Sequence, residues 1–265
     1  MESTVDNTKI IIKKDTIVRL IKDVKQLKGH PLACNNIYYY HDEEDILKGY
    51  ALIIGTCDTP YFAGYYLFEL TYPTDYPHNP PVVTYLTNGD KIRFNPNLYV
   101  NGKVCISLLN TWRGEQWTSC QSINTVLLTL GTLLCNNPLL NEPGIREGHY
   151  DCENYNKIIQ YKNIEIAILN ILSLKNFQSI CKIIQLFRPI LIENFHNHYD
   201  KIKTFLEKKK EEPSILIKTN IYNMSVYIDY NKLYKKFTEL VIYKEDIEKE
   251  DIEKEDIKNQ NNIIN

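Results

Sequence analysis

One cysteine sits among residues that could support nucleophilic chemistry. Cys105 follows an Asn-Gly pair at 101–102, and an Asn-Pro-Asn triplet lies upstream at 95–97. Asn-Gly strongly favours a tight turn because both residues tolerate positive φ, so we expect Cys105 in a loop that an incoming group can reach. A thiolate there would be a strong nucleophile. A lone cysteine is more often a small buried apolar residue, so the rest of the chain must decide.

The composition is that of a globular chain that can bury a core. Hydrophobic residues make up 43% and charged residues 24% of the 265 positions, which allows one domain with an extension or two small domains. The net charge of -2 gives no basic footprint for nucleic acid. No apolar run could span a bilayer, and the first residues lack a signal-peptide core. We therefore expect an intracellular protein, in the cytoplasm or nucleus, without nucleic-acid or membrane partners.

The cysteines give no sign of a disulfide framework or a metal site. All seven are scattered, and none belongs to a C-x-x-C pair. An odd, scattered set argues against both paired disulfides and zinc. We expect reduced thiols and no bound metal.

The elements that would position Cys105 are a helix, four strands and a second helix. Apolar spacing predicts an amphipathic helix over 15–28, capped by Asp15, whose buried face carries Ile17, Leu20, Ile21, Val24 and Leu27. Its other face is basic, and we expect it to be solvated or, alternatively, to dock a partner; it carries Arg19, Lys22, Lys25 and Lys28. Strand-like runs follow at 37–41, 50–55, 65–72 and 82–86. No helix-length segment separates these runs, so they predict an antiparallel meander. After Trp117 the spacing becomes helical, and Thr118-x-x-Gln121 predicts a capping box at the start of that helix.

The second half of the sequence is predicted to be helical. Helical patterns cover 154–172, 176–188, 189–211 and 229–242. Their apolar faces must be buried, and no linker is evident near 148–150, so we expect 151–243 to pack on a core formed by 1–150. The remainder, 244–265, begins with a KEDIE repeat that has too few apolar groups to offset chain entropy. We expect it to be a mobile tail or a single solvated helix.

Taken together, these features resemble the ubiquitin-conjugating enzymes, or E2s. The match runs in order through most of 15–150. It comprises the first helix, T-P-Y-x-x-G (59–64), Y-P-x-x-P-P (76–81), Pro96-Asn97 of a His-Pro-Asn signature, Asn-Gly-x-x-Cys (101–105) and Trp117 with its helix. Any one motif is weak evidence, but several at the family's spacing are specific. The R-F-N-P-N-L-Y run and N-E-P-G (141–144) are most similar to the large Z-type E2s and to the E2 modules of giant inhibitor-of-apoptosis proteins.

The resemblance implies a fold and a reaction. The fold would be α+β: a ubiquitin-conjugating fold with a four-stranded antiparallel meander, flanking helices and an α-helical C-terminal extension. An E1 enzyme, of the alternative type if the Z-type likeness holds, would pass ubiquitin or a ubiquitin-like modifier to Cys105 as a thioester. A substrate lysine, often brought by an E3 ligase, would then attack. The E1 uses the ATP, so this chain would need no cofactor.

The resemblance also assigns roles around the cysteine. Asn97 would either donate to the oxyanion formed when lysine attacks or brace the active-site loop. Glu142 matches the acidic residue at the lysine gate, where an acid helps to orient the amine and accept its proton. Asn95 replaces the family's structural His, and Pro96 follows it. Without the resemblance, Asn97 would be a turn residue and Glu142 an ordinary surface glutamate.

Two partner surfaces follow from the same resemblance. Arg19 and Lys22 match positions that meet the acidic surface of the E1. His78 replaces a loop Phe that meets E3 ligases, and Ser119 and Cys120 replace the Pro and Ala that usually follow Trp-Ser. These departures weaken the case for common RING and HECT ligases, so the E3 and the substrate stay open.

Two other functions compete with conjugation. A catalytically inactive E2-like module could bind ubiquitin or a ligase, but such variants lack the cysteine, and Cys105 is in register. A cysteine protease or deubiquitinase needs a His base near the thiol, and none of the six His residues lies in a matching motif. An adduct on Cys105 that depends on E1 and ATP and is cleaved by thiols would separate conjugation from both.

Overall fold

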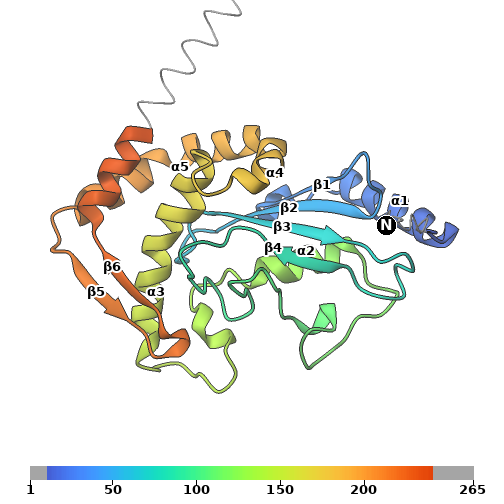
Figure 1. Ribbon diagram of the computed structural model, residues 1–265, viewed down its shortest axis with the longest axis horizontal. Helices are drawn as coiled ribbons and strands as arrows, with labels where there is room; N and C mark the ends of the chain where they lie inside the picture. The colour runs from blue at the N-terminus through green and yellow to red at the C-terminus, as the bar shows by residue number, and fades with distance from the viewer. Residues whose placement is uncertain (1–10, 241–265) are drawn as a thin grey trace, which may run out of the picture.

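An antiparallel sheet of four strands forms the centre of the fold (Figure 1) in the computed structural model, which describes residues 11–240. The strands are β1 (Ile37–His41), β2 (Lys48–Ile54), β3 (Tyr65–Thr71) and β4 (Val82–Tyr85), and they pair in chain order. Leu52, for example, lies opposite Tyr38 on one side and Leu67 on the other. The predicted meander and the α+β class are confirmed.

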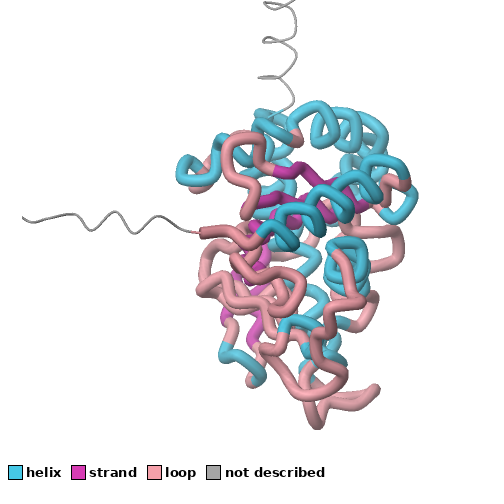
Figure 2. Tube along the Cα trace, turned by 90° about the vertical axis from the view of Figure 1, so that its right-hand side faces the viewer, coloured by secondary structure: helices cyan, strands magenta, loops and turns pink. Residues whose placement is uncertain are grey.

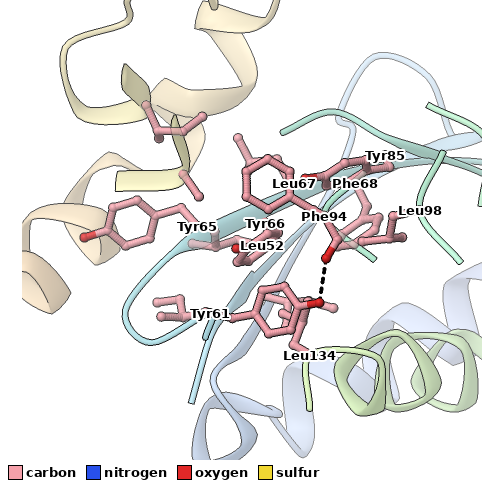
Figure 3. Packing of buried hydrophobic residues seen from close by; sticks show 14 of the residues in the cluster. Leu52, Tyr61, Tyr65, Tyr66, Leu67, Phe68, Tyr85, Phe94, Leu98 and Leu134 are labelled. Atoms are coloured by element: carbon pink, nitrogen blue, oxygen red, sulfur yellow. Dashed lines mark hydrogen bonds between the residues drawn. The ribbon is translucent and has the colours of Figure 1, made fainter. Parts of the chain in front are cut away.

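Strand β3 is covered on both faces, which explains its run of aromatic and apolar residues. Tyr65, Tyr66, Leu67 and Phe68 are all fully buried, and large side chains of this kind suit a packed, pleated surface. A buried hydroxyl without a partner costs about 1–3 kcal/mol. The buried tyrosines avoid this cost, as Figure 3 shows for Tyr61, whose hydroxyl donates to the Phe94 carbonyl at 2.6 Å.

Helix α1 (Lys14–Gly29) forms as predicted, but its buried face is rotated from the predicted one. Leu20 and Leu27 are buried as expected, whereas Ile21 is 45% exposed. Its place on the inner face is taken by Asp23, a buried carboxylate that a hydrophobicity pattern cannot predict. The Asp15 cap is wrong, because the N-cap is Lys13, which makes no side-chain cap, and Asp15 lies in the first turn.

Helix α2 (Ile123–Thr132) packs against α1 and β1. Its capping box is made by Ser122 and Thr125, so the predicted Thr118–Gln121 box is wrong. Thr118 and Gln121 do pair, but in the loop before the helix, where the Thr118 amide donates to the Gln121 side chain at 2.8 Å. Both pairs have suitable spacing, and the helix begins at the later one.

The C-terminal extension combines helices with a hairpin that the sequence did not predict. Its helices are α3 (Asp151–Lys162), α4 (Cys181–Leu186), α5 (Arg188–Lys209) and a final one over 230–240. Helix α3 continues without a break as a π-helical segment, Asn163–Asn170. Strands β5 (Ile215–Lys218) and β6 (Ser225–Ile228) pair antiparallel and lie alongside α3 (Figure 1).

The extension packs directly on the core, as predicted. Tyr65 of β3 donates to the Leu191 carbonyl of α5 at 2.9 Å, and Tyr66 donates to the Asn163 side chain at 2.7 Å. In Figure 2, helices gather around the strands in the upper half of the view, and loops make up most of the lower half. The predicted mobile tail, 244–265, lies outside the described residues. None of the helices described over 11–240 is long and apolar enough to cross a bilayer.

Candidate functional site

The loop that carries Cys105 is anchored to the edge of the sheet. Gly102 has a φ of +89°, which closes the turn predicted for the Asn-Gly pair. Its carbonyl accepts a hydrogen bond from Tyr85 of β4 at 2.7 Å. On the other side of the turn, the Tyr99 amide donates to the Lys103 carbonyl at 2.9 Å. The segment before Cys105 is therefore tied to β4.

Two reciprocal hydrogen bonds join Asn97 to Cys105. The Cys105 amide donates to the Asn97 carbonyl at 2.9 Å, and Asn97 Nδ2 donates to the Cys105 carbonyl at 2.6 Å. Of the two roles expected for Asn97, these bonds are the contacts that a brace would make. Nδ2 carries two hydrogens, and the bond to the Cys105 carbonyl uses one.

Asn95 is the buried hub of the same loop. Its side chain is fully buried; Oδ1 accepts from the Asn97 amide at 2.9 Å. Nδ2 donates to the Leu133 carbonyl at the end of α2, at 2.8 Å, and to the Tyr61 hydroxyl at 3.2 Å. This geometry suits the structural role expected for the residue that replaces the family's His.

The Cys105 thiol is more enclosed than the sequence predicted. Cys105 is only 4% exposed, and its Sγ donates to the Thr111 carbonyl at 2.9 Å. The chain turns back through a short 3-10 helix, Ser107–Leu109, and the left-handed residue Asn110, which brings Thr111 against the thiol. The Ile106 amide, donating to the Thr111 hydroxyl at 3.0 Å, fixes this turn. A turn motif alone does not reveal such a return of the chain.

Glu142 is paired with a residue from the C-terminal extension. It is half-buried and follows a short 3-10 helix, Pro138–Asn141. The Tyr222 hydroxyl donates to Glu142 Oε2. Burial first, and then the hydrogen bond and charge of Glu142, raise the pKa of Tyr222 well above its usual value. Tyr222 therefore stays protonated and acts as the donor.

Arg93 connects Tyr222 to the loop before Cys105. Its guanidinium lies 4.9 Å from the centre of the Tyr222 ring and 3.4 Å from that of Tyr99. It also donates to the carbonyls of Pro96, at 2.6 Å, and Asn95, at 3.2 Å. Sequence reasoning missed Arg93 and Tyr222. Arg93 stands inside the R-F-N-P-N run, whereas Tyr222 belongs to the unpredicted hairpin.

The two residues predicted to meet the E1 differ in their surroundings. Lys22 is exposed on α1. Arg19 is tied inward: its Nε lies 2.9 Å from the buried Asp23 carboxylate, Nη1 donates to the Ser119 carbonyl at 2.7 Å, and Nη2 donates to the Gln121 carbonyl. The sequence predicted a solvated basic face, and Arg19 departs from it because Asp23 lies on the inner side of the helix.

The two residues of the predicted E3 loops lie near one another. His78 and Ser119 are both exposed. Trp117 Nε1 donates to the Pro77 carbonyl, next to His78, at 2.7 Å, and Ser119 follows two residues after Trp117. The bond from Arg19 to Ser119 joins α1 to this pair. The structure therefore brings Lys22, His78 and Ser119 to neighbouring elements.

Comparison with known proteins identifies the family of this chain. A family model described as ubiquitin-conjugating enzyme matches residues 19–163, more than half of the chain. The chain belongs to the ubiquitin-conjugating enzyme family. The match takes in the sheet, the Cys105 loop, Glu142 and α3, and it ends before the hairpin.

Several curated E2s are similar to this chain. The ubiquitin-conjugating enzyme E2 Z of Xenopus tropicalis is 36% identical over 187 residues, covering 69% of this chain and 58% of that protein. E2 Z of Homo sapiens is also 36% identical, with 51% of its length covered. The human dual E2/E3 protein BIRC6 is 45% identical over 120 residues, 42% of this chain and 2% of BIRC6. The chain thus spans little more than half the length of the E2 Z relatives.

Proposed function

We propose that this E2-family member is active. It accepts ubiquitin or a ubiquitin-like modifier from an E1 as a thioester on Cys105 and transfers it to a lysine, together with an E3. The reciprocal bonds between Asn97 and Cys105 support this most directly. They hold the side-chain amide of Asn97 against the backbone of Cys105, which matches the position of the family's nucleophile. The likeness to E2 Z supports the alternative type of E1 as the partner.

Loading begins with the Cys105 proton. Sγ donates it to the Thr111 carbonyl in this structure, and the proton must leave because the thiolate is the nucleophile. The thiolate attacks the thioester carbonyl of the modifier on the E1, and the E1 cysteine leaves as a thiolate that takes up a proton. No cofactor takes part, because the E1 spends the ATP. Within 11–240 no cluster of His, Cys, Asp or Glu could hold a metal.

Transfer to lysine uses Asn97 and Glu142. A neutral lysine amine attacks the thioester and creates an oxyanion that needs a hydrogen-bond donor. The second hydrogen of Asn97 Nδ2 is this donor, while the first stays bonded to the Cys105 carbonyl. Glu142 orients the amine and accepts its proton, and Cys105 leaves as the thiolate. We expect the E3 to bind near His78 and Ser119.

A charging assay tests this proposal. The full chain is incubated with ATP, with the usual or the alternative E1, and with ubiquitin or a ubiquitin-like modifier in each combination. At least one combination should give an adduct that a thiol reagent cleaves. Cys105→Ser should give a thiol-resistant ester that hydroxide cleaves, and Cys105→Ala should give none. Cys120→Ser, which changes an exposed cysteine, is the matched control and should charge normally.

Two results would contradict the proposal. Charging of Cys105→Ala would place the thioester elsewhere. Failure of the unaltered chain with every E1 and modifier would favour an inactive module that binds ubiquitin or a ligase.

A further inference from the structure

We infer that Tyr222, supplied by the hairpin of the C-terminal extension, is a positioning residue for the attack of lysine on the Cys105 thioester. It acts by holding the Glu142 carboxylate in place. This inference rests on the proposed function and adds to it a residue that lies outside the segment matched by the family model.

The first observation is the contact itself. The hydrogen bond from the Tyr222 hydroxyl to Glu142 Oε2 joins residues that are 80 positions apart. The hydroxyl is a firm donor, because burial and Glu142 raise its pKa. With Oε2 occupied, the carboxylate keeps one orientation, and Oε1 is the oxygen that can accept from a lysine amine.

The second observation is the backbone at the hairpin tip. Tyr222 has a φ of +63°, a left-handed conformation that is costly for a bulky side chain. Such conformations persist where surrounding contacts impose them, and they gather at functional sites. Here the conformation places the ring over Arg93 and the hydroxyl at Glu142.

A third observation explains how the tip is held against the core. Asp151, in the first turn of α3, is only 3% exposed. Its Oδ2 accepts from the amides of Asn220, at 2.9 Å, and Ile221, at 2.8 Å. The buried carboxylate therefore fixes the two residues before Tyr222 relative to α3.

Arg93 places this contact next to the catalytic loop. Its guanidinium faces the Tyr222 ring and donates to the carbonyls of Asn95 and Pro96, the two residues before Asn97. Asn97 in turn is bonded to Cys105. A continuous chain of contacts thus runs from Glu142 through Tyr222 and Arg93 to the loop that holds the nucleophile.

Tyr222→Phe is the sharpest test, since it keeps the ring over Arg93 and removes only the hydroxyl. The full-length variant is charged, the E1 is stopped, and discharge of the thioester is followed against free lysine. Charging should be unchanged, whereas the maximal rate of discharge to lysine should fall about tenfold, as expected for one lost hydrogen bond to a charged group. The lysine concentration that gives half the maximal rate should change little. Cleavage by dithiothreitol, which needs no lysine gate, should keep its rate.

Two further variants separate positioning from a general structural role. Tyr227→Phe alters an exposed tyrosine of the same hairpin and should discharge normally. Glu142→Gln should slow discharge, and adding Tyr222→Phe to it should cause little further loss, since Tyr222 acts through that carboxylate.

The inference fails if Tyr222→Phe discharges to lysine at the unaltered rate, or if its effect adds fully to that of Glu142→Gln. It also fails if cleavage by dithiothreitol slows as much as lysine attack, because that would mean a disturbed loop. All three outcomes leave charging of Cys105 intact. Failure of the unaltered chain to charge would instead contradict the proposed function.

Discussion

The two sides of the candidate site are held together over very different distances in sequence. On the nucleophile side, the side chain of Asn97 bonds to a residue eight positions away, Cys105. On the gate side, Glu142 bonds to Tyr222 across 80 positions, and Asp151 bonds to Asn220 across 69. The nucleophile side can form within the core, whereas the gate side is complete only when the extension is docked. Damage to the nucleophile side should therefore slow transfer to lysine by removing a catalytic group. Damage to the docked extension should slow it only by loosening the position of Glu142.

The largest effect is expected on the nucleophile side. Asn97→Ala removes the amide that is proposed to face the oxyanion, and losing one such donor costs about 10²–10³ in rate. Thioester formation should persist, while transfer to lysine should slow by that factor. Single-turnover charging and discharge, measured separately, give the two rates.

The brace from Asn97 to Cys105 makes the opposite outcome informative as well. If Asn97→Ala loses charging and discharge to the same extent, the side chain matters for the shape of the loop and not for the oxyanion. Circular dichroism of the variant shows whether the rest of the fold is intact.

The next effect concerns the anchor on the gate side. Asp151→Ala leaves the amides of Asn220 and Ile221 without their acceptor, and we expect a loss of roughly 2–3 kcal/mol in the free energy of unfolding. Discharge to lysine should slow as in Tyr222→Phe, because the tip loses its position. Urea unfolding and the discharge assay measure the two effects.

Glu153→Ala provides the matched control for Asp151. Glu153 also lies in the first turn of α3, but its side chain is 79% exposed. Stability and discharge should both be unchanged. If Asp151→Ala behaves like this control, the hairpin tip does not depend on the buried carboxylate.

The contrast between near and distant contacts also explains what the sequence could predict. The strands, the Asn-Gly turn and the register of Cys105 with Asn97 depend on neighbours in the chain, and periodicity and motif spacing record them. The contacts of Tyr222 with Arg93 and Glu142 depend on how the extension docks, and no local sequence pattern predicts that docking. Even so, the short, largely apolar ILIK and SVYI runs on either side of an Asn-containing turn were a usable hairpin signal.

Two buried polar residues show the limit of hydrophobic periodicity. Asp23 and Asn95 are polar residues at buried positions, and each is satisfied by partners far along the chain: Tyr76 at 2.6 Å and Leu133 at 2.8 Å. Hydrophobic periodicity assigns polar residues to the surface, so it placed Asp23 outside the buried face of α1 and predicted that face wrongly. For Asn95, the resemblance to a family with a structural residue there gave the better prediction.

A smaller effect separates the two basic residues of α1. Arg19→Ala should lower the free energy of unfolding by about 1–2 kcal/mol, because Asp23 loses its guanidinium and the Ser119 and Gln121 carbonyls lose a donor. Lys22→Glu should leave stability unchanged and slow charging by the E1, more strongly at low salt. Thermal unfolding and charging rates at two salt concentrations distinguish them. If Lys22→Glu and the unaltered chain charge equally fast at low salt, this face of α1 is solvated and does not bind the E1.

The smallest effect concerns an ion-pair cluster at the junction with the core. Glu165 accepts from Lys162 at 2.7 Å and from Lys236, and Lys162 also reaches Asp90 of the core at 2.8 Å. Burial alone would raise the pKa of Glu165, but the two lysines outweigh it and lower the pKa below its usual 4.5.

The direction of this shift fixes the pH dependence. A carboxylate with a lowered pKa in the folded state stabilises above its unfolded pKa, and the contribution is lost as pH falls through the folded value. Glu165→Gln should therefore cost at most about 1 kcal/mol at neutral pH, and the gap to the unaltered chain should narrow as pH falls below 4.5. Urea unfolding across this range measures the gap. A gap that stays constant with pH would mean that the side chain stabilises the junction by packing, and the distant contact would then not depend on charge.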